Sequence, residues 1–334
     1  METVGIGSTL ESLRAGLRGT AYAAGEDGYD EASRAWNLNA HQEPALVVMA
    51  EGAADVMAAV RFARDLGVGV GVLATGHGVG IPCDGGVLVN TSRMRGVRVD
   101  PVARTARVEA GALWTDVIPE TQAHGLAGLV GSTSHVGVVG YTMGGGFGWL
   151  GRRYGLNGAG VTEADVVTAD GELLRVGADE HPDLFWGLGG GGGNFGIVTS
   201  LEFRVYPLTA VYGGNVFYPV EKAGEVLDLY ARWSADLPDE MTTAVTFLNV
   251  PPCRTYRSPC VVDRSWSCGA ATLVRTRRTA RRCSVPRGRG SASPSWTRSG
   301  SCPSPLWTRS AWTPWTPWAP SSTPRCCATS RPRP

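Results

Sequence analysis

The dominant feature of this sequence is a set of glycine-rich segments that lie between Gly67 and Gly196. The longest spans residues 131–149 and holds seven glycines in nineteen residues. Glycine loses more conformational freedom on folding than other residues do, so this segment is a poor helix or strand former. Its apolar residues are equally untypical of a flexible linker. We therefore predict a loop that packs beneath a large, flat ligand.

A second glycine-rich segment, residues 73–82, directly follows an apolar strand candidate. Such a turn exposes successive backbone N–H groups, which suit a diphosphate. His77 lies between Gly76 and Gly78, where little crowds its side chain and it can face a ligand. The alternative, which the local sequence favours, is an ordinary histidine in a surface loop. A third glycine run, at 188–199, enters a strand, and a tight turn is a fair competing explanation for it.

The glycines also include a partial match to dinucleotide-binding loops. No apolar strand leads into the Gly-x-Gly-x-Gly run at 144–148, and residues 146–151 have the full GxGxxG spacing. No acidic residue about twenty positions further on lies at the end of a strand, as the dinucleotide fold requires. The sequence therefore argues against a Rossmann fold and a nicotinamide dehydrogenase.

Hydrophobic periodicity predicts a mixture of strands and helices over residues 37–207. The apolar run at 44–49 predicts a buried strand, and helical spacing predicts a helix over 54–66 that ends at Gly67. Further strands are predicted at 68–73, in hairpins at 97–109 and 164–176, and at 197–205. Because the strands outnumber the helices and do not alternate regularly with them, we predict an α+β fold.

The composition changes abruptly after residue 250. Residues 1–250 hold 16 basic and 29 acidic side chains, whereas residues 251–334 hold 15 arginines and one acid, Asp263. Seven of the eight cysteines also follow residue 250. A basic arm that binds nucleic acid is one interpretation. A metal or disulfide framework is another, but no CxxC pair with a partner supports it.

We interpret residues 251–334 as a frame-shifted, disordered tail, on the basis of codon arithmetic. Tryptophan is encoded only by UGG and threonine by ACN, so a Trp-Thr pair read one base earlier contains GAC, an aspartate codon. Four such pairs occur in the tail, at 296–297, 307–308, 312–313 and 315–316. The shifted reading restores the missing acidic and aliphatic residues and removes the unusual tryptophans.

Eight separated motifs together resemble a known family. They are 76–78 (Gly-His-Gly), 84–86 (Asp-Gly-Gly), 137–140 (Gly-Val-x-Gly), 144–148 (Gly-Gly-Gly-Phe-Gly), 154–156 (Tyr-Gly-Leu), 168–171 (Thr-Ala-Asp-Gly), 183–186 (Asp-Leu-Phe-Trp) and 190–196 (Gly-Gly-Gly-Gly-Asn-Phe-Gly). In this order they resemble the PCMH-type FAD-binding domain of berberine bridge enzyme-like, FAD-linked oxidases, which are similar to vanillyl-alcohol oxidase. The resemblance covers roughly residues 30–250.

The resemblance implies an architecture, a cofactor and a set of site residues. The implied α+β fold is a PCMH-type domain of two α/β subdomains over 39–208, after a lead-in of residues 1–38 and before a truncated substrate domain that begins at 209–250. The implied cofactor is FAD, bound covalently through its 8α-methyl group to His77. The other residues implied to contact FAD are Ala74, Thr75, Gly76, Gly78, Val79, Gly131, Ser132, Gly137, Gly140, Tyr141, Gly144, Gly145, Gly146, Gly148, Gly196, Ile197 and Val198.

The sequence departs from this family in two places. Members with two flavin bonds carry a cysteine at a position that falls near Thr133 here, so we expect a single histidyl bond. Cys83 lies in another loop and is expected to be a small buried residue. The substrate-domain sheet, the catalytic base and the returning segment of the family are absent or scrambled. Their loss would leave apolar surface and one face of the flavin uncovered.

The resemblance implies an oxidase that passes hydride from a small-molecule substrate to FAD and on to O2. A sugar, an alkaloid-like amine, an alcohol or a polyketide intermediate would suit the scaffold. The alternatives are a flavin-binding but inactive fragment and a basic-tailed nucleic-acid binder. We expect no metal, nucleic-acid or membrane partner. Because the sequence shows no signal peptide and no run of about eighteen apolar residues, we expect a cytoplasmic protein.

Overall fold

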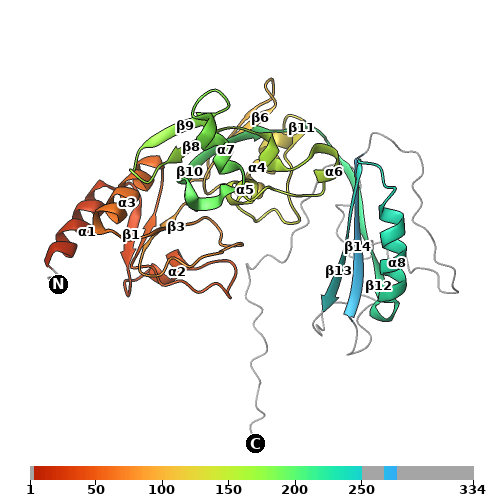
Figure 1. Ribbon diagram of the computed structural model, residues 1–334, viewed down its shortest axis with the longest axis horizontal. Helices are drawn as coiled ribbons and strands as arrows, with labels where there is room; N and C mark the ends of the chain where they lie inside the picture. The colour runs from red at the N-terminus through yellow and green to blue at the C-terminus, as the bar shows by residue number, and fades with distance from the viewer. Residues whose placement is uncertain (1–3, 250–266, 277–334) are drawn as a thin grey trace, which may run out of the picture.

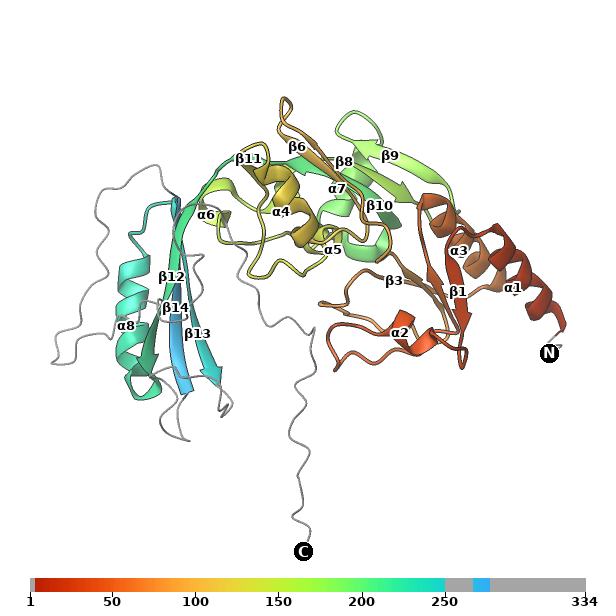
Figure 2. The ribbon, with the colours of Figure 1, turned by 180° about the vertical axis from the view of Figure 1, so that it is seen from behind.

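The computed structural model describes residues 4–249 and 267–276. These residues form an arc of three larger sheets (Figure 1), seen from behind in Figure 2, together with a fourth sheet of two short strands. A four-stranded sheet lies at one end, a five-stranded sheet lies in the middle, and a three-stranded sheet with one helix lies at the other end.

The first sheet contains three parallel strands and one antiparallel edge strand, in the order β1-β2-β4-β3. Its elements are α1 (Val4–Gly16), β1 (Thr20–Ala23), α2 (Tyr29–Ser33), β2 (Leu46–Met49), α3 (Ala53–Leu66), β3 (Val70–Leu73) and β4 (Val87–Asn90). β4 is buried along its whole length, as expected of a continuous apolar run between two layers. α3 ends at Gly67, which adopts the left-handed conformation (φ 68°) that a helix-terminating glycine provides.

The first sheet includes residues that the sequence assigned to a lead-in. β1 pairs with β2 from Thr20↔Met49 to Ala23↔Leu46, so residues 20–23 are part of the sheet rather than ahead of it. Leu13 of α1 belongs to the same buried cluster as Val56 and Val60 of α3. Sequence periodicity did not reveal β1 because the strand is four residues long and only Ala21 is buried in it.

Asp55 connects several elements of the first subdomain, which we define as residues 4–90, from α1 to β4. Its carboxylate is 1 % exposed and accepts hydrogen bonds from the backbone N–H groups of Arg18 (2.9 Å), Gly19 (3.0 Å) and Glu51 (2.9 Å). The start of β1, the β2–α3 connection and the first turn of α3 therefore meet at one side chain. A carboxylate in the first turn of a helix is also favoured by the helix dipole.

The second sheet is antiparallel, in the order β5-β6-β10-β8-β9. Its strands are β5 (Val97–Asp100), β6 (Thr105–Glu109), β8 (Val161–Val167), β9 (Leu173–Gly177) and β10 (Ile197–Arg204). The two predicted hairpins are confirmed as β5–β6 and β8–β9. The two-faced strand predicted at 197–205 is confirmed as β10, which lies in the centre of the sheet.

The two faces of the second sheet differ in chemistry. On one face, Leu201 and Phe203 pack with helix residues such as Trp114 in a buried cluster. The helices concerned are α4 (Trp114–Gln122), α5 (Val138–Met143) and α7 (Pro182–Gly191). The sheet also carries a polar cluster. In it, the Arg107 guanidinium pairs with the Asp165 carboxylate, and Ser200 Oγ donates a hydrogen bond of 2.7 Å to the same carboxylate. The apolar alternation along β10 thus directs the helices to one side.

The first two sheets are joined at α3. The Arg64 guanidinium donates a hydrogen bond of 2.9 Å to the carbonyl oxygen of Asp170, in the turn between β8 and β9. Gly171 in that turn has φ 74° and lies against Arg61, where a Cβ would come within 2.4 Å of the Arg61 side chain. The α3 helix therefore fixes how the two sheets face one another.

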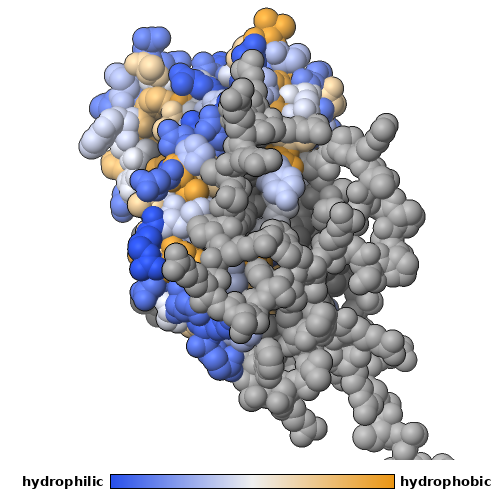
Figure 3. Space-filling model, turned by 90° about the vertical axis from the view of Figure 1, so that its right-hand side faces the viewer, coloured by the Kyte–Doolittle hydropathy of each residue, from blue (hydrophilic) through white to orange (hydrophobic). Residues whose placement is uncertain are grey.

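The remaining elements lead to the third sheet. They are β7 (Leu126–Ala127), which pairs with β11 (Tyr206–Pro207), the short helix α6 (Gly151–Tyr154), and β12 (Val211–Pro219), α8 (Ala223–Ser234), β13 (Met241–Asn249) and β14 (Ser267–Thr276). Figure 3 faces this end of the molecule, where hydrophilic and apolar side chains are mixed over the described surface.

β14 lies inside the segment that the sequence predicted to be a disordered tail. It pairs with both β12 and β13 and forms the middle strand of the third sheet. Its sequence contains the run Ala-Ala-Thr-Leu-Val at 270–274, which suits a central strand. The rest of the predicted tail lies outside the described residues. No helix among the described residues is long and apolar enough to cross a membrane.

Candidate functional site

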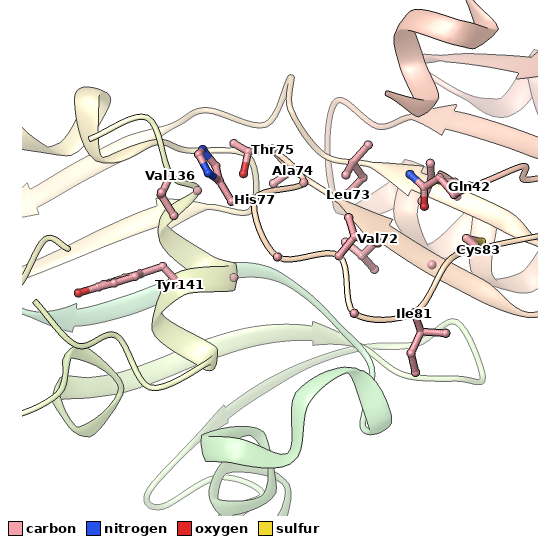
Figure 4. Close-up of a pocket in the computed structure, with 18 residues that line it drawn as sticks. Gln42, Val72, Leu73, Ala74, Thr75, His77, Ile81, Cys83, Val136 and Tyr141 are labelled. Carbon is pink, nitrogen blue, oxygen red and sulfur yellow. The ribbon is translucent and has the colours of Figure 1, made fainter. Parts of the chain in front are cut away.

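A cavity of about 330 Å³ lies where the first two sheets meet, and its lining is drawn in Figure 4. This volume is at the lower end of the range for small-molecule sites. The first subdomain contributes the end of β3 and the loop that follows it, whereas the second contributes the start of α5. The lining residues are Gln42, 71–81, Cys83, Leu88, Val136, Gly137, Gly140 and Tyr141.

The loop after β3 is held by a segment from the N-terminal part of the chain. The backbone N–H of Trp36 donates to the Thr75 carbonyl over 2.8 Å, and that of Asn37 donates to the Gly76 carbonyl over 3.2 Å. Gly76 has φ 75°, and a Cβ built there would lie 2.7 Å from the Cα of Ala35. Only glycine fits this close approach at a positive φ without strain. We call residues 32–37 the strap.

The two glycines beside His77 are expected to respond differently to substitution. In Gly76→Ala, the alanine has to adopt a left-handed backbone conformation, and its Cβ clashes with the strap. The substitution should therefore lower the free energy of unfolding by about 2–3 kcal/mol. Gly78→Ala is the matched control, because Gly78 has no atom within 4 Å of a built Cβ and no positive φ. Urea unfolding of both variants measures the difference. Equal stabilities would contradict the assigned role of the strap.

His77 carries its ring at the edge of this cavity. The ring stacks on the indole of Trp36, with centroids 4.0 Å apart and planes inclined by 22°. Its Nε2 atom is buried and has no hydrogen-bond partner among the described residues. Burial lowers the pKa of His77, and the nearby backbone of His135 partly opposes that shift. The imidazole is therefore uncharged at neutral pH and keeps a nitrogen lone pair for bonding.

The opposite wall of the cavity is the start of α5. A Cβ at Gly137, the residue before the helix, would lie 3.5 Å from the Cβ of Ala74, so one methyl group added there would bring the two walls into contact. Gly140, one turn further, has open space beside it. Tyr141 is held by its hydroxyl, which donates to the Leu129 carbonyl over 2.8 Å, and burial raises the pKa of the phenol.

The structure corrects the prediction of a loop at 131–149. Residues 138–143 form the short helix α5, because Val138, Val139 and Thr142 are buried against the second sheet. Tertiary burial thus overrides the low helix propensity of the flanking glycines. Figure 4 shows Tyr141 on this helix, with its ring extending away from the loop that carries His77.

The other glycines of this segment pack around Tyr141 and the main chain. A Cβ at Gly131 or Gly146 would lie 3.0 Å from the Tyr141 ring, and one at Gly148 would lie 2.0 Å from the Val130 carbonyl oxygen. They allow the segment to fold back on itself. The sequence signal was correct about close packing, but the packed partner in the described structure is the protein itself.

The predicted contact at 196–198 lies away from the cavity. Gly196 has φ 140°, and a Cβ there would lie 2.5 Å from the Val167 carbonyl oxygen. Ile197 and Val198 pair with Val167 and Val166 at the start of β10. Their described contacts are those of a strand entrance.

The structure therefore brings part of the predicted site together. The predicted residues that line the cavity are Ala74, Thr75, Gly76, His77, Gly78, Val79, Gly137, Gly140 and Tyr141. Those that do not line it are Gly131, Ser132, Gly144, Gly145, Gly146, Gly148, Gly196, Ile197 and Val198.

The residues at the site that sequence reasoning missed include Trp36, Gln42 and Cys83. Trp36 stacks on His77, and Gln42 lines the cavity. Cys83, set aside as a small buried residue, is indeed buried and free, and it also lines the cavity. Its thiol packs against Gly71, and burial raises its pKa. The alternation of glycine with apolar residues in β3 had indicated a close backbone approach at Gly71. No sequence pattern indicated that Trp36 belongs to the site.

The lining has the features that a flavin nucleotide needs. Gly78, Gly80 and Gly140 border open space, so a ligand can approach their backbone without meeting side chains. The buried Nε2 of His77 has no partner within the described protein. Glycine-rich backbone turns suit phosphate groups, and an uncharged imidazole is able to form a bond to carbon. On these observations the residues present fit the predicted cofactor.

Comparisons with known proteins agree with this assignment. A family of FAD-binding domains matches residues 44–177. An FAD-linked oxidoreductase of Dictyostelium discoideum is 33 % identical over 233 residues, which cover 69 % of this chain and 52 % of that protein. The crystal structure of 6-hydroxy-D-nicotine oxidase from Arthrobacter nicotinovorans superposes with a TM-score of 0.69 at 27 % identity, over 78 % of this chain and 56 % of that one.

A third comparison is the BBE-like 1 protein of Physcomitrella patens. It matches with a TM-score of 0.66 at 25 % identity, over 79 % of this chain and 56 % of that one. The chain thus spans about half the length of the curated relatives it matches.

Proposed function

This chain contains an FAD-binding domain and is related to the berberine bridge enzyme-like, FAD-linked oxidases, and from this premise we propose that it oxidises a small molecule with FAD that is covalently attached to His77. The observation that carries the proposal is the buried, unpartnered Nε2 of His77 at the edge of a glycine-lined cavity. Bound FAD would supply the redox chemistry, by accepting hydride from a substrate and passing the electrons to O2.

The residues of the loop after β3 would hold the nucleotide. The backbone of 74–78 would bind the diphosphate, and Gly137 and Gly140 would allow the flat ring system to approach α5. Tyr141 would pack against the cofactor rather than move a proton, because its hydroxyl already donates to Leu129 and its pKa is raised. The shared lining of both subdomains would exclude water from the reacting atoms.

The proposed attachment to His77 is a two-electron oxidation of the cofactor's 8α-methyl group. An N–C bond would replace one N–H bond of the imidazole and one C–H bond of the 8α-methyl group, and two protons would be released. The two electrons set free would pass through FAD to O2, the proposed acceptor of the reaction. Only the uncharged imidazole has a lone pair for this bond, which agrees with the lowered pKa of His77.

A second candidate is a flavin-binding protein without turnover. It is favoured by one observation of the described cavity lining: besides His77, its titratable side chains are Cys83 and Tyr141, and burial raises the pKa of both. Oxygen uptake separates the candidates, since only the oxidase consumes O2 continuously when an oxidisable substrate is supplied.

Flavin retention after denaturation tests the proposed attachment. The chain, purified with FAD present, is precipitated with acid, and we expect yellow colour in the washed pellet and a peptide containing His77 with the mass of one added FAD. A sample precipitated first and mixed with FAD afterwards is the control for trapping. Flavin found wholly in the supernatant would exclude a covalent bond, and a colourless protein would exclude FAD binding.

A further inference from the structure

Trp36 contacts His77 although it lies outside the glycine-rich segments. It precedes residues 44–177, to which the FAD-binding family matches. Its indole nevertheless stacks on the His77 ring, with centroids 4.0 Å apart and an inclination of 22°. At this separation and inclination, one face of the imidazole is covered by an aromatic surface.

The strap that carries Trp36 is anchored on both sides. The Asn90 side-chain amide donates to the Ala32 carbonyl over 2.8 Å in a buried contact, and the Gln42 amide donates to the Ser33 carbonyl over 2.9 Å. Ala35 is 4 % exposed and packs with Leu73 in the core. Together with the Trp36 N–H bond to Thr75, these contacts fix the backbone from which the indole projects.

The indole itself contributes little to the core. Trp36 is 65 % exposed, which is unusual for a tryptophan on such a firmly held segment. Among the described residues, its ring stacks on that of His77. A fixed backbone that presents a mostly exposed aromatic ring to one histidine therefore indicates a role toward that histidine.

Among the described residues, few titratable groups lie near His77. His135 acts on it through its backbone and its ring, and Tyr141 and Cys83 are the other titratable side chains of the cavity lining. Tyr141 and Cys83 both have raised pKa values, so they stay uncharged at neutral pH. The access of water to the His77 ring is therefore the main influence on the pKa of His77, and the Trp36 indole covers one face of that ring.

We propose that Trp36 is a positioning residue for the attachment of flavin to His77: the stacked indole fixes the plane of the imidazole and keeps water from one of its faces. The inference rests on the proposed function, because it concerns how His77 is prepared for that bond. Loss of the indole admits water and lets the ring rotate. The pKa of His77 then rises toward its ordinary value, and attachment requires a higher pH.

The test compares Trp36→Ala with Trp36→Phe and with Leu38→Ala. Leu38 is a matched control, since it is 73 % exposed and lies two residues away. FAD is added to cofactor-free protein at a series of pH values, and acid-stable flavin is measured against time. The titration of the His77 ring is followed by NMR in the same cofactor-free proteins.

We expect attachment in Trp36→Ala to be about tenfold slower near pH 6, the loss that follows from a misplaced reacting group. Its pH profile and the His77 titration should both move to higher pH. Trp36→Phe should restore most of the rate, and Leu38→Ala should match the wild type. A wild-type rate and an unchanged His77 titration in Trp36→Ala would overturn the inference while leaving the proposed function intact. A wild type without acid-stable flavin would overturn both.

Discussion

His77→Ala is expected to lose all acid-stable flavin, whereas His135→Ala retains it. Both histidines lie near the cavity, but His77 alone has a ring nitrogen that is buried and without a partner in the described structure. Alanine removes the nucleophile and leaves the glycine backbone of the loop in place. We therefore expect the variant to bind FAD reversibly, so that the yellow colour leaves the protein when it is denatured.

The measurement is the absorbance of the acid pellet and of the supernatant for the two variants and the wild type. Circular dichroism of both variants controls for folding. Colour that stays in the His77→Ala pellet and is lost from that of His135→Ala would move the anchor to His135. Colour in both pellets would place the bond elsewhere.

Asp55→Ala is expected to lower the free energy of unfolding by about 3–5 kcal/mol. The substitution leaves the backbone N–H groups of Arg18, Gly19 and Glu51 without their buried acceptor. Space beside Gly19 is already limited, since a Cβ there would lie 1.9 Å from the Met49 carbonyl oxygen. The segment is therefore too tightly packed to move toward another acceptor.

Asp55→Asn and Asp65→Ala calibrate this result in urea unfolding. The asparagine keeps one acceptor oxygen and should fall between the wild type and Asp55→Ala. Asp65 is an exposed residue of the same helix whose ion pair with Arg64 is at the surface, so its removal should change stability by less than about 1 kcal/mol. An Asp55→Ala variant as stable as Asp65→Ala would show that these hydrogen bonds are dispensable.

The parts of the fold that were predictable are those with a strong local pattern. The helix at 53–66 has apolar residues at helical spacing and a terminating Gly67, and β10 alternates along eight residues. β1 and α5 were missed because they are four and six residues long and depend on partners distant in sequence. β14 was missed because its run of suitable residues is embedded in an arginine- and cysteine-rich sequence.

The residues of the site can also be divided into those that the sequence predicted and those that it did not. His77 and its flanking glycines were found from the family resemblance, since the local sequence alone favoured a surface-loop histidine, and they do line the cavity. Gly146 and Gly148 were assigned to the cofactor, yet the atoms nearest to them belong to Tyr141, Asn157 and Val130. A glycine signals that something approaches closely and does not say what. Trp36 could not be found because its stacking partner is 41 positions away in sequence.

The strap and the central strand have a consequence for recombining this domain with others. The segment recognised by family similarity, 44–177, omits both the strap at its front and β10 at its back. A graft cut at those limits would transplant His77 without the backbone that seats its loop, and the second sheet would lack its middle strand. The smallest exchangeable unit suggested by the contacts therefore runs from α1 to β11, residues 4–207, which is longer than the recognisable signature at both ends.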